Sequence, residues 1–229
     1  MADKQTQIKL PLVAVDDGYA QMKVVGDDPR GGKKPVLLSI RSSIRHGSIG
    51  SVSGDGAVAT YETDDGATRM TVSDEVAGQS TQFDGFHTSP MDRILIAHAL
   101  SAAGYDNKSI DLWTGLPLSD FFLQDSKNEA LIEKKKANLR IPVVSIVPGA
   151  SPCPKYNSIS VGCQALAAFL DYGIDDDFND RDVGIDKVGV VDIGGRTTDI
   201  AVILGGKRCD YSRSGTENIG VLDVQKNLA

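Results

Sequence analysis

Apolar residues along this chain fall into short runs whose spacing alternates between that of strands and that of helices. Residues 36–40 and 110–115 are dense in apolar side chains over a short length, which predicts two buried strands. Across residues 89–103 the apolar side chains return every three or four positions, which predicts a helix. Residues 46–71 are rich in glycine, serine, threonine and aspartate, and we expect hairpins or loops there.

The same alternation continues in the second half of the chain. Residues 126–140 are predicted to form a helix with a capping box, because Ser126 is followed three positions later by Glu129. Residues 143–147 are predicted to form another strand, and residues 161–172 another helix. Strands and helices in this order indicate an α/β fold, with a mixed sheet covered by helices.

Two segments far apart in the chain match each other. Residues 13–24 and residues 190–202 each contain an apolar strand, then Asp-x-Gly, then a small polar turn, then a second strand. Each segment is predicted to be a β-hairpin with a glycine turn and an acidic residue, Asp16 or Asp192, at its mouth. Their separation is that of a domain duplication rather than of a short repeat.

These hairpins carry the residue types of a phosphate site. A glycine turn lets backbone amides approach a phosphate, and a carboxylate at each strand end can hold Mg²⁺ through its water shell. Lys23 on the second strand of the first hairpin, and Thr197 and Thr198 in the second turn, could add phosphate contacts. A single Asp-x-Gly is more often a structural turn. The pair favours function, because both acids directly follow a buried strand.

Composition narrows the function classes. The chain has 229 residues, of which 31 are acidic and 24 are lysine or arginine, giving a net charge of −7. Direct contact with a nucleic-acid backbone normally needs a basic surface, so none is expected. No apolar run is long enough to span a membrane, residues 1–7 are predicted to be a disordered tail rather than a signal peptide, and three cysteines fit a reducing cytoplasm.

Five segments together resemble one known family. Asp16-Asp17-Gly18 is similar to a first phosphate motif, and Asp-Ile-Gly-Gly-Arg-Thr-Thr-Asp at residues 192–199 to a second. The likeness is extended by Ile-Ala-His-Ala-Leu at 96–100, by residues 114–122, which contain Leu-Pro-Leu, and by residues 132–140, which contain Lys-Lys-Ala-Asn. The chain thereby resembles the actin, sugar-kinase and heat-shock-chaperone ATPase superfamily, and within it the plasmid-segregation actins of the ParM/StbA family.

The resemblance implies an actin-like, ribonuclease H-like fold of duplicated α/β domains with ATP and Mg²⁺ in the cleft. It implies a first domain over residues 1–172, an acidic linker over 173–187, and the start of a second domain over 188–229. It also implies filaments that assemble with ATP, weaken on hydrolysis, and segregate plasmid DNA through a DNA-bound adaptor protein. The implied residues are Asp16 and Asp192 for the metal, Asp192 also for catalysis, and for the nucleotide Asp17, Gly18, Tyr19, Lys23, Gly194, Gly195, Arg196 and Thr197.

Some positions depart from the family pattern. Tyr19 stands where a serine or threonine is usual, so only its backbone amide is expected to contact phosphate. Arg196 replaces a small residue, and two alternatives stay open: a phosphate contact or a side chain in solvent. Relatives orient the attacking water with a Glu or Gln; Asn157 is the nearest match, and Gln164 follows a little further on. Relatives also continue to an adenosine-binding glycine loop, so we expect the chain to be truncated at its C-terminus.

Two other classes compete with the filament-forming ATPase. A small-molecule kinase of the same superfamily would need a substrate-binding insertion, and none stands out. A regulatory relative that binds partners without hydrolysis would explain an unmatched water-orienting residue. Outside the motifs, residues 134–136 are predicted to lie on a solvated helix face, His98 is predicted to pack in the core, and the environment of His87 stays open.

Overall fold

The computed structural model describes residues 9–49, 58–64, 66–75, 78–175, 177, 179, 181, 186–206 and 208–228. The predicted tail over residues 1–7 and much of the predicted acidic linker lie outside these residues. No helix within the described part of the chain is long and apolar enough to cross a membrane.

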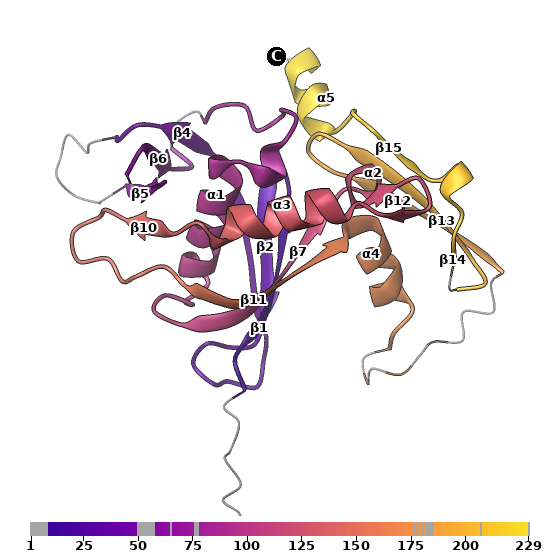
Figure 1. Ribbon diagram of the computed structural model, residues 1–229, viewed down its shortest axis with the longest axis horizontal. Coiled ribbons are helices and arrows are strands. Elements are labelled where there is room, and N and C mark those ends of the chain that lie inside the picture. The colour runs from indigo at the N-terminus through magenta and orange to yellow at the C-terminus, as the bar shows by residue number, and fades with distance from the viewer. Residues whose placement is uncertain are drawn as a thin grey trace, which may run out of the picture.

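The first half is built on a five-stranded mixed sheet in the order β11-β7-β1-β2-β3 (Figure 1). β1 pairs antiparallel with β2, and β2 with β3, whereas β1 pairs parallel with β7, and β7 with β11. The carboxyl ends of the three parallel strands therefore meet at one edge of the sheet, where α/β folds bind ligands. The strands are β1 (Leu12–Asp17), β2 (Gln21–Gly26), β3 (Val36–Arg41), β7 (Ser109–Leu116) and β11 (Lys155–Cys163).

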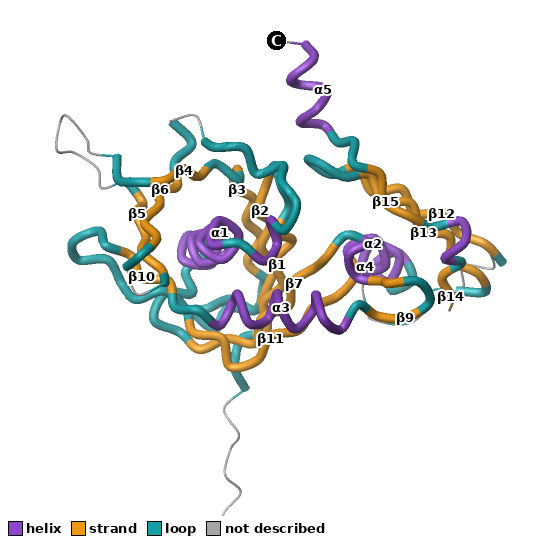
Figure 2. Tube along the Cα trace, turned by 45° about the horizontal axis from the view of Figure 1, so that its top comes forward, coloured by secondary structure: helices purple, strands orange, loops and turns teal. Residues whose placement is uncertain are grey.

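A smaller antiparallel sheet in the order β10-β5-β6-β4 lies on the other side of α1. The two sheets curve around this helix, which lies at the centre of the first half (Figure 2). Seven apolar residues of α1 are buried there, and Ser89 caps the helix by accepting from the Asp92 amide at 3.3 Å. The elements are β4 (Ile44–His46), β5 (Ala59–Thr63), β6 (Thr68–Val72), η1 (Phe86–Thr88), α1 (Pro90–Ala102) and β10 (Val143–Ser145).

The second half is a sheet in the order β12-β13-β14, with β15 also paired to β13. One of its faces packs on α2 and α4 around a second apolar cluster that includes Phe169 and Ala201. Val191 and Ile193 on the opposite face are 61% and 63% exposed. The elements are α2 (Leu118–Phe121), β8 (Phe122–Leu123), β9 (Ser126–Lys127), α4 (Gln164–Tyr172), β12 (Lys187–Ile193), β13 (Thr198–Leu204), β14 (Arg208–Cys209), η2 (Tyr211–Arg213), β15 (Gly215–Glu217) and α5 (Val221–Leu228).

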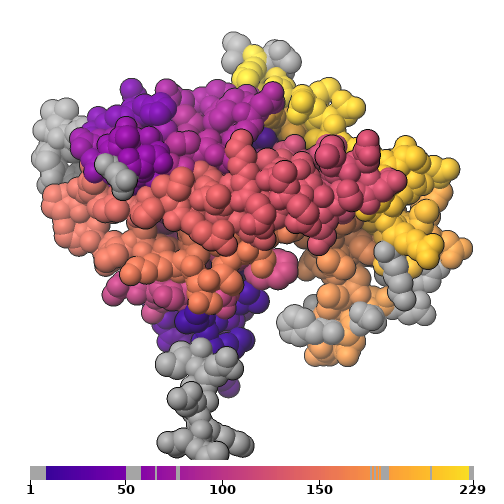
Figure 3. Space-filling model, in the orientation of Figure 1, coloured from indigo at the N-terminus to yellow at the C-terminus, as the bar shows by residue number. Residues whose placement is uncertain are grey.

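α3 (Glu129–Arg140) lies against both halves. Its residue Leu139 belongs to the core of the first half, and Ile132 belongs to the cluster of the second. In the space-filling view this helix and its flanking residues form a continuous band across the molecule (Figure 3).

Two predicted helices begin later than expected. The α3 cap is Asn128, which accepts from the Leu131 amide at 3.2 Å, because Ser126 is used in the short β8–β9 ribbon. Residues 161–163 belong to β11 rather than to a helix, because β7 pairs with this strand as far as Cys163. The domain boundary at residues 173–187 stays a prediction; α4, which precedes it, packs on β12 and β13.

Candidate functional site

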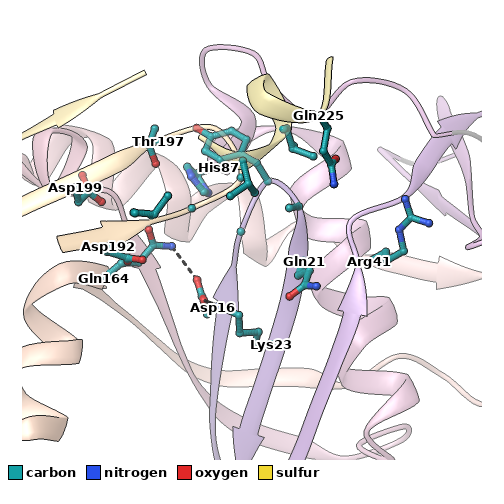
Figure 4. Close-up of a pocket in the computed structure, with 18 residues that line it drawn as sticks. Asp16, Gln21, Lys23, Arg41, His87, Gln164, Asp192, Thr197, Asp199 and Gln225 are labelled. Carbon is teal, nitrogen blue, oxygen red and sulfur yellow. Dashed lines mark hydrogen bonds and ion pairs between the residues drawn. The ribbon is translucent and has the colours of Figure 1, made fainter. Parts of the chain in front are cut away.

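The two matching glycine turns border the same cavity, of about 420 Å³ (Figure 4). The first turn joins β1 to β2, and the second joins β12 to β13. The start of α4 and one side of α5 also border the cavity. It is lined by Asp16, Gly18, Tyr19, Ala20, Gln21, Lys23, Arg41, His87, Gln164, Asp192, Ile193, Gly194, Gly195, Thr197, Asp199, Val221, Leu222 and Gln225.

The backbone of the first turn is held by the body of the first half. The carbonyl oxygen of Gly18 accepts from the Ser42 hydroxyl at 2.7 Å, and that of Tyr19 from the Thr81 hydroxyl at 2.6 Å. The Ala20 carbonyl accepts from the Ser42 amide at 2.9 Å. In a trans peptide the following N–H points the opposite way from the carbonyl. The amides that follow these carbonyls are therefore turned away from Ser42 and Thr81.

The second turn meets the first with no room for a side chain between them. A Cβ atom on Gly195 would lie 2.7 Å from the Ala20 nitrogen, so the turns can approach only because residue 195 is glycine. The carbonyls of Gly194 and Gly195 accept from the Val221 and Leu222 amides at the start of α5, both at 3.0 Å. These bonds fix the plane of the turn in the same way as Ser42 and Thr81 fix the first.

Two carboxylates lie between the turns with a lysine and a glutamine beside them. Lys23 donates to Asp16 Oδ2 at 2.9 Å, and Gln164 donates to Asp16 Oδ1 at 3.2 Å. The Asp16 bond raises the pKa of Lys23. Burial, and next the charge of Asp16, raise the pKa of Asp192. Two acids that repel each other in this way are suited to a cation, which would relieve the repulsion.

The cavity brings together most of the predicted site residues. Asp16, Gly18, Tyr19, Lys23, Asp192, Gly194, Gly195 and Thr197 all line it. Asp17, Arg196 and Asn157 do not line it, and each has other partners.

Asp17 points into the protein, not into the cavity. Its carboxylate is fully buried and accepts from Lys135 Nζ, from the Thr114 hydroxyl at 2.6 Å and from His87 Nδ1 at 2.9 Å. Burial alone would raise the pKa of Asp17, but the charge of Lys135 and the hydrogen bond from His87 outweigh it and hold that pKa well below its ordinary value. The predicted phosphate contact is therefore corrected to a structural ion pair. The prediction of a solvated lysine face is wrong for Lys135, which is fully buried.

The Arg196 side chain is turned toward protein rather than toward solvent, and its phosphate contact stays a prediction. Its guanidinium donates to Asp84 at 2.5 Å and lies over the ring of Tyr19, 5.5 Å from the ring centroid. The arginine therefore joins the second turn to the segment that precedes α1, across the two halves.

Asn157 lies outside the cavity. It is exposed on β11 and donates to Asp111 at 2.8 Å. Gln164 is the first residue of α4 and does line the cavity, because β11 is parallel to β1 and ends at the same edge. The position of Gln164 could have been predicted by ending the strand at residue 163. His87 carried no comparable sequence signal.

The sheet order, the duplicated glycine hairpins and the cleft between them define an actin-like fold. Among solved structures, an archaeal actin homolog aligns at a TM-score of 0.68 with 23% identity, covering 96% of this chain and 65% of that one. The psk41 ParM protein aligns at a TM-score of 0.66 with 15% identity, and the alignment covers 96% of this chain and 69% of that one. The actin-like protein Alp7A aligns at a TM-score of 0.68 with 15% identity, and the alignment covers 94% of this chain and 62% of that one. The chain thus spans just under two thirds of the archaeal homolog.

The family follows from the sequence itself. The model of the plasmid segregation protein ParM, N-terminal family matches residues 11–160. No curated protein sequence matches the chain. The chain belongs to this ParM family, as the sequence motifs predicted.

Proposed function

We propose that the chain is the nucleotide-binding part of an actin-like ATPase that segregates plasmid DNA. The observation that carries the proposal is the pair of glycine turns that border one cavity together with Asp16 and Asp192. One structure of the archaeal actin homolog, at 22% identity and a TM-score of 0.66, is a complex with ADP.

In the proposed site the chain holds the phosphates from two sides. The amides of the first turn face away from Ser42 and Thr81 and can donate to phosphate oxygens. Lys23 adds a positive charge, and the Thr197 hydroxyl a further donor. Asp16 and Asp192 would hold Mg²⁺ through its waters, and the ion would neutralise charge on the phosphates.

Gln164 is the residue we propose to orient the attacking water. Its side-chain nitrogen is fixed by Asp16, at 3.2 Å, which leaves its carbonyl oxygen able to accept a hydrogen bond from water. This replaces Asn157, which the fold places against Asp111.

At the level of the cell, the proposal includes filament assembly with ATP, a DNA-bound adaptor protein as partner, and a cytoplasmic location. Another relative, at 16% identity and a TM-score of 0.58, is described as a filament structure of Alp12. The net charge of −7 agrees with contact to DNA through an adaptor rather than directly. The first domain ending near residue 172 and the second beginning near 188 remain part of this proposal.

Calorimetric titration with ADP and Mg²⁺ tests the site. We expect saturable binding that depends on Mg²⁺ and is lost in Asp192→Ala. Asp111→Ala is the matched control, since Asp111 is a carboxylate outside the cavity that bonds Asn157 and Ser158. Absence of binding by the parent chain, or equal binding by Asp192→Ala, would refute the nucleotide site. ATP-dependent pelleting of the protein tests assembly separately.

A further inference from the structure

His87 is fixed between the first glycine turn and the interior. It lies in η1, directly before α1, and is 4% exposed. Its ring packs edge-on against Tyr19 and Phe86, with centroid distances of 5.0 and 5.3 Å. A buried ring packed against two aromatic side chains has little freedom to rotate. The positions of its two nitrogens are therefore set by the fold.

One of these nitrogens, Nδ1, forms a hydrogen bond with a buried residue. Nδ1 lies 2.9 Å from Asp17 Oδ2, and Asp17 is held in turn by Lys135 and Thr114. An ionised carboxylate can only accept, so the proton of this bond is on Nδ1. The Asp17–Lys135 pair thus orients the ring as a carboxylate orients a catalytic histidine.

The other nitrogen has no partner. Nε2 is buried, and no atom of the described residues forms a hydrogen bond with it. The same ring lines the cavity between the glycine turns. In the view of Figure 4 it is drawn on the opposite side of the cavity from Lys23. A buried polar atom without a partner is rare and costly, and such atoms gather at functional sites. Because the ring lines the cavity, a ligand bound there could supply the missing hydrogen-bond partner of Nε2.

We propose that His87 is a ligand contact of the phosphate site, with Nε2 donating a hydrogen bond to a phosphate oxygen of the bound nucleotide. This inference rests on the proposed function. Because the Nδ1–H group already donates a hydrogen bond to Asp17, the ring can also donate from Nε2 only when both nitrogens carry a proton, that is, as an imidazolium. The second proton comes from solvent. The cation would then lie between two anions, Asp17 and the phosphate.

The charged and titratable groups around the ring come from several elements. A charged ring would be attracted by Asp17 of β1 and repelled by Lys135 of α3, which binds the same carboxylate. Burial and the charge of Asp17 raise the pKa of Asp92 of α1 well above its ordinary value, which favours its neutral form. A bound anion would place a second negative charge beside the ring, which would stabilise an imidazolium.

Nitrogen NMR of the histidine rings tests the contact directly. The chain has three histidines, so a ¹⁵N-histidine-labelled sample gives few signals. On addition of ADP with Mg²⁺, and separately of inorganic phosphate, we expect both ring nitrogens of His87 to move to imidazolium values while those of His46 and His98 stay in place. A ring that stays neutral while backbone amides of the glycine turns respond would overturn the role of His87 and leave the nucleotide site standing. No response anywhere would refute both.

A variant pair gives a second readout. His87→Gln removes the titrating ring, and we expect it to bind ADP with Mg²⁺ about tenfold more weakly, as for loss of a charge-assisted hydrogen bond. Proton uptake on binding, measured by calorimetry in buffers of different ionisation enthalpy, should vanish with it. His98→Gln is the matched control, since His98 Nδ1 also makes one 2.9 Å bond, to Tyr61, but lies outside the cavity. Unchanged affinity and proton uptake in His87→Gln would contradict the proposal.

Discussion

At the scale of single residues, the ion pair between Lys135 and Asp17 decides how the first glycine turn is supported. Both side chains are fully buried, and Lys135 also donates to the Gly115 carbonyl. Removing one partner of such a pair leaves an unpaired charge in the interior, which costs about 3–5 kcal/mol. We therefore expect Lys135→Met to lower the free energy of unfolding by that amount in urea denaturation.

The neighbouring lysine supplies the control for this measurement. Lys134 is exposed on the same helix, and Lys134→Met should change stability by less than about 0.5 kcal/mol. Equal effects of the two substitutions would contradict the assignment of Lys135 to the interior.

The buried carboxyl group of Asp92 should make the free energy of unfolding depend on pH. Its pKa in the folded chain is raised well above the ordinary value by burial and by Asp17. Above about pH 4 the unfolded chain releases this proton and the folded chain keeps it, so Asp92 lowers stability as pH rises. Asp92→Asn mimics the protonated acid, and its stability relative to the parent should grow by up to about 1.4 kcal/mol per pH unit from pH 4 upward.

Denaturation at a series of pH values checks this expectation. Asp111 provides a control of opposite sign, because hydrogen bonds from Asn157 and Ser158 lower its pKa. Asp111→Asn should therefore lose stability relative to the parent as pH rises through the acid range. A pH-independent difference between Asp92→Asn and the parent would show that Asp92 is ionised in the folded chain.

At the scale of elements, the start of α5 holds the second glycine turn. The Val221 amide donates to the Gly194 carbonyl at 3.0 Å. Proline is tolerated at the first position of a helix but has no N–H, so Val221→Pro removes this bond and keeps the helix. We expect ADP with Mg²⁺ to bind about fivefold more weakly, the effect of one ordinary hydrogen bond. Val221→Ala keeps the amide and should therefore bind more tightly than Val221→Pro; if the two are weakened equally, the side chain and not the bond matters.

The elements that could be predicted from sequence are those that local pattern specifies. The two hairpins follow from alternating apolar residues and glycine turns, and the start of α1 follows from Ser89-Pro90. Lys135 and His87 could not be predicted, because their partner Asp17 is far away in the chain. A lysine within a charged run has the same local pattern whether its side chain is solvated or, as in α3, turned toward a buried acid. The same limit applies to Asn157 and Gln164, whose roles depended on where β11 ends.

At the scale of the whole molecule, side chains bridge the two halves beside the cavity. Arg196 reaches Asp84, and α5 reaches the same segment through Asp223, which accepts from Gln82 at 3.1 Å, and through Lys226. These contacts must open if the halves separate to release a ligand. Since exposed ion pairs contribute up to about 1 kcal/mol, we expect Arg196→Ala to speed release of labelled ADP by about fivefold or less.

Stopped-flow release in low and high salt measures this effect. In the parent, release should quicken with salt, because screening weakens exposed pairs. Arg213→Ala is the control, as Arg213 pairs with Asp210 within the second half at 3.5 Å. If Arg196→Ala and Arg213→Ala release ADP at the same rate, the bridge does not restrain the cleft.

The position of α3 has a consequence for cooperativity. Because Ile132 and Leu139 of one continuous helix belong to different apolar clusters, displacement of this helix would weaken the packing of both. Lys135 lies between them and holds the acid beneath the first glycine turn. We therefore expect the two halves to unfold together, although they border the cavity from opposite sides.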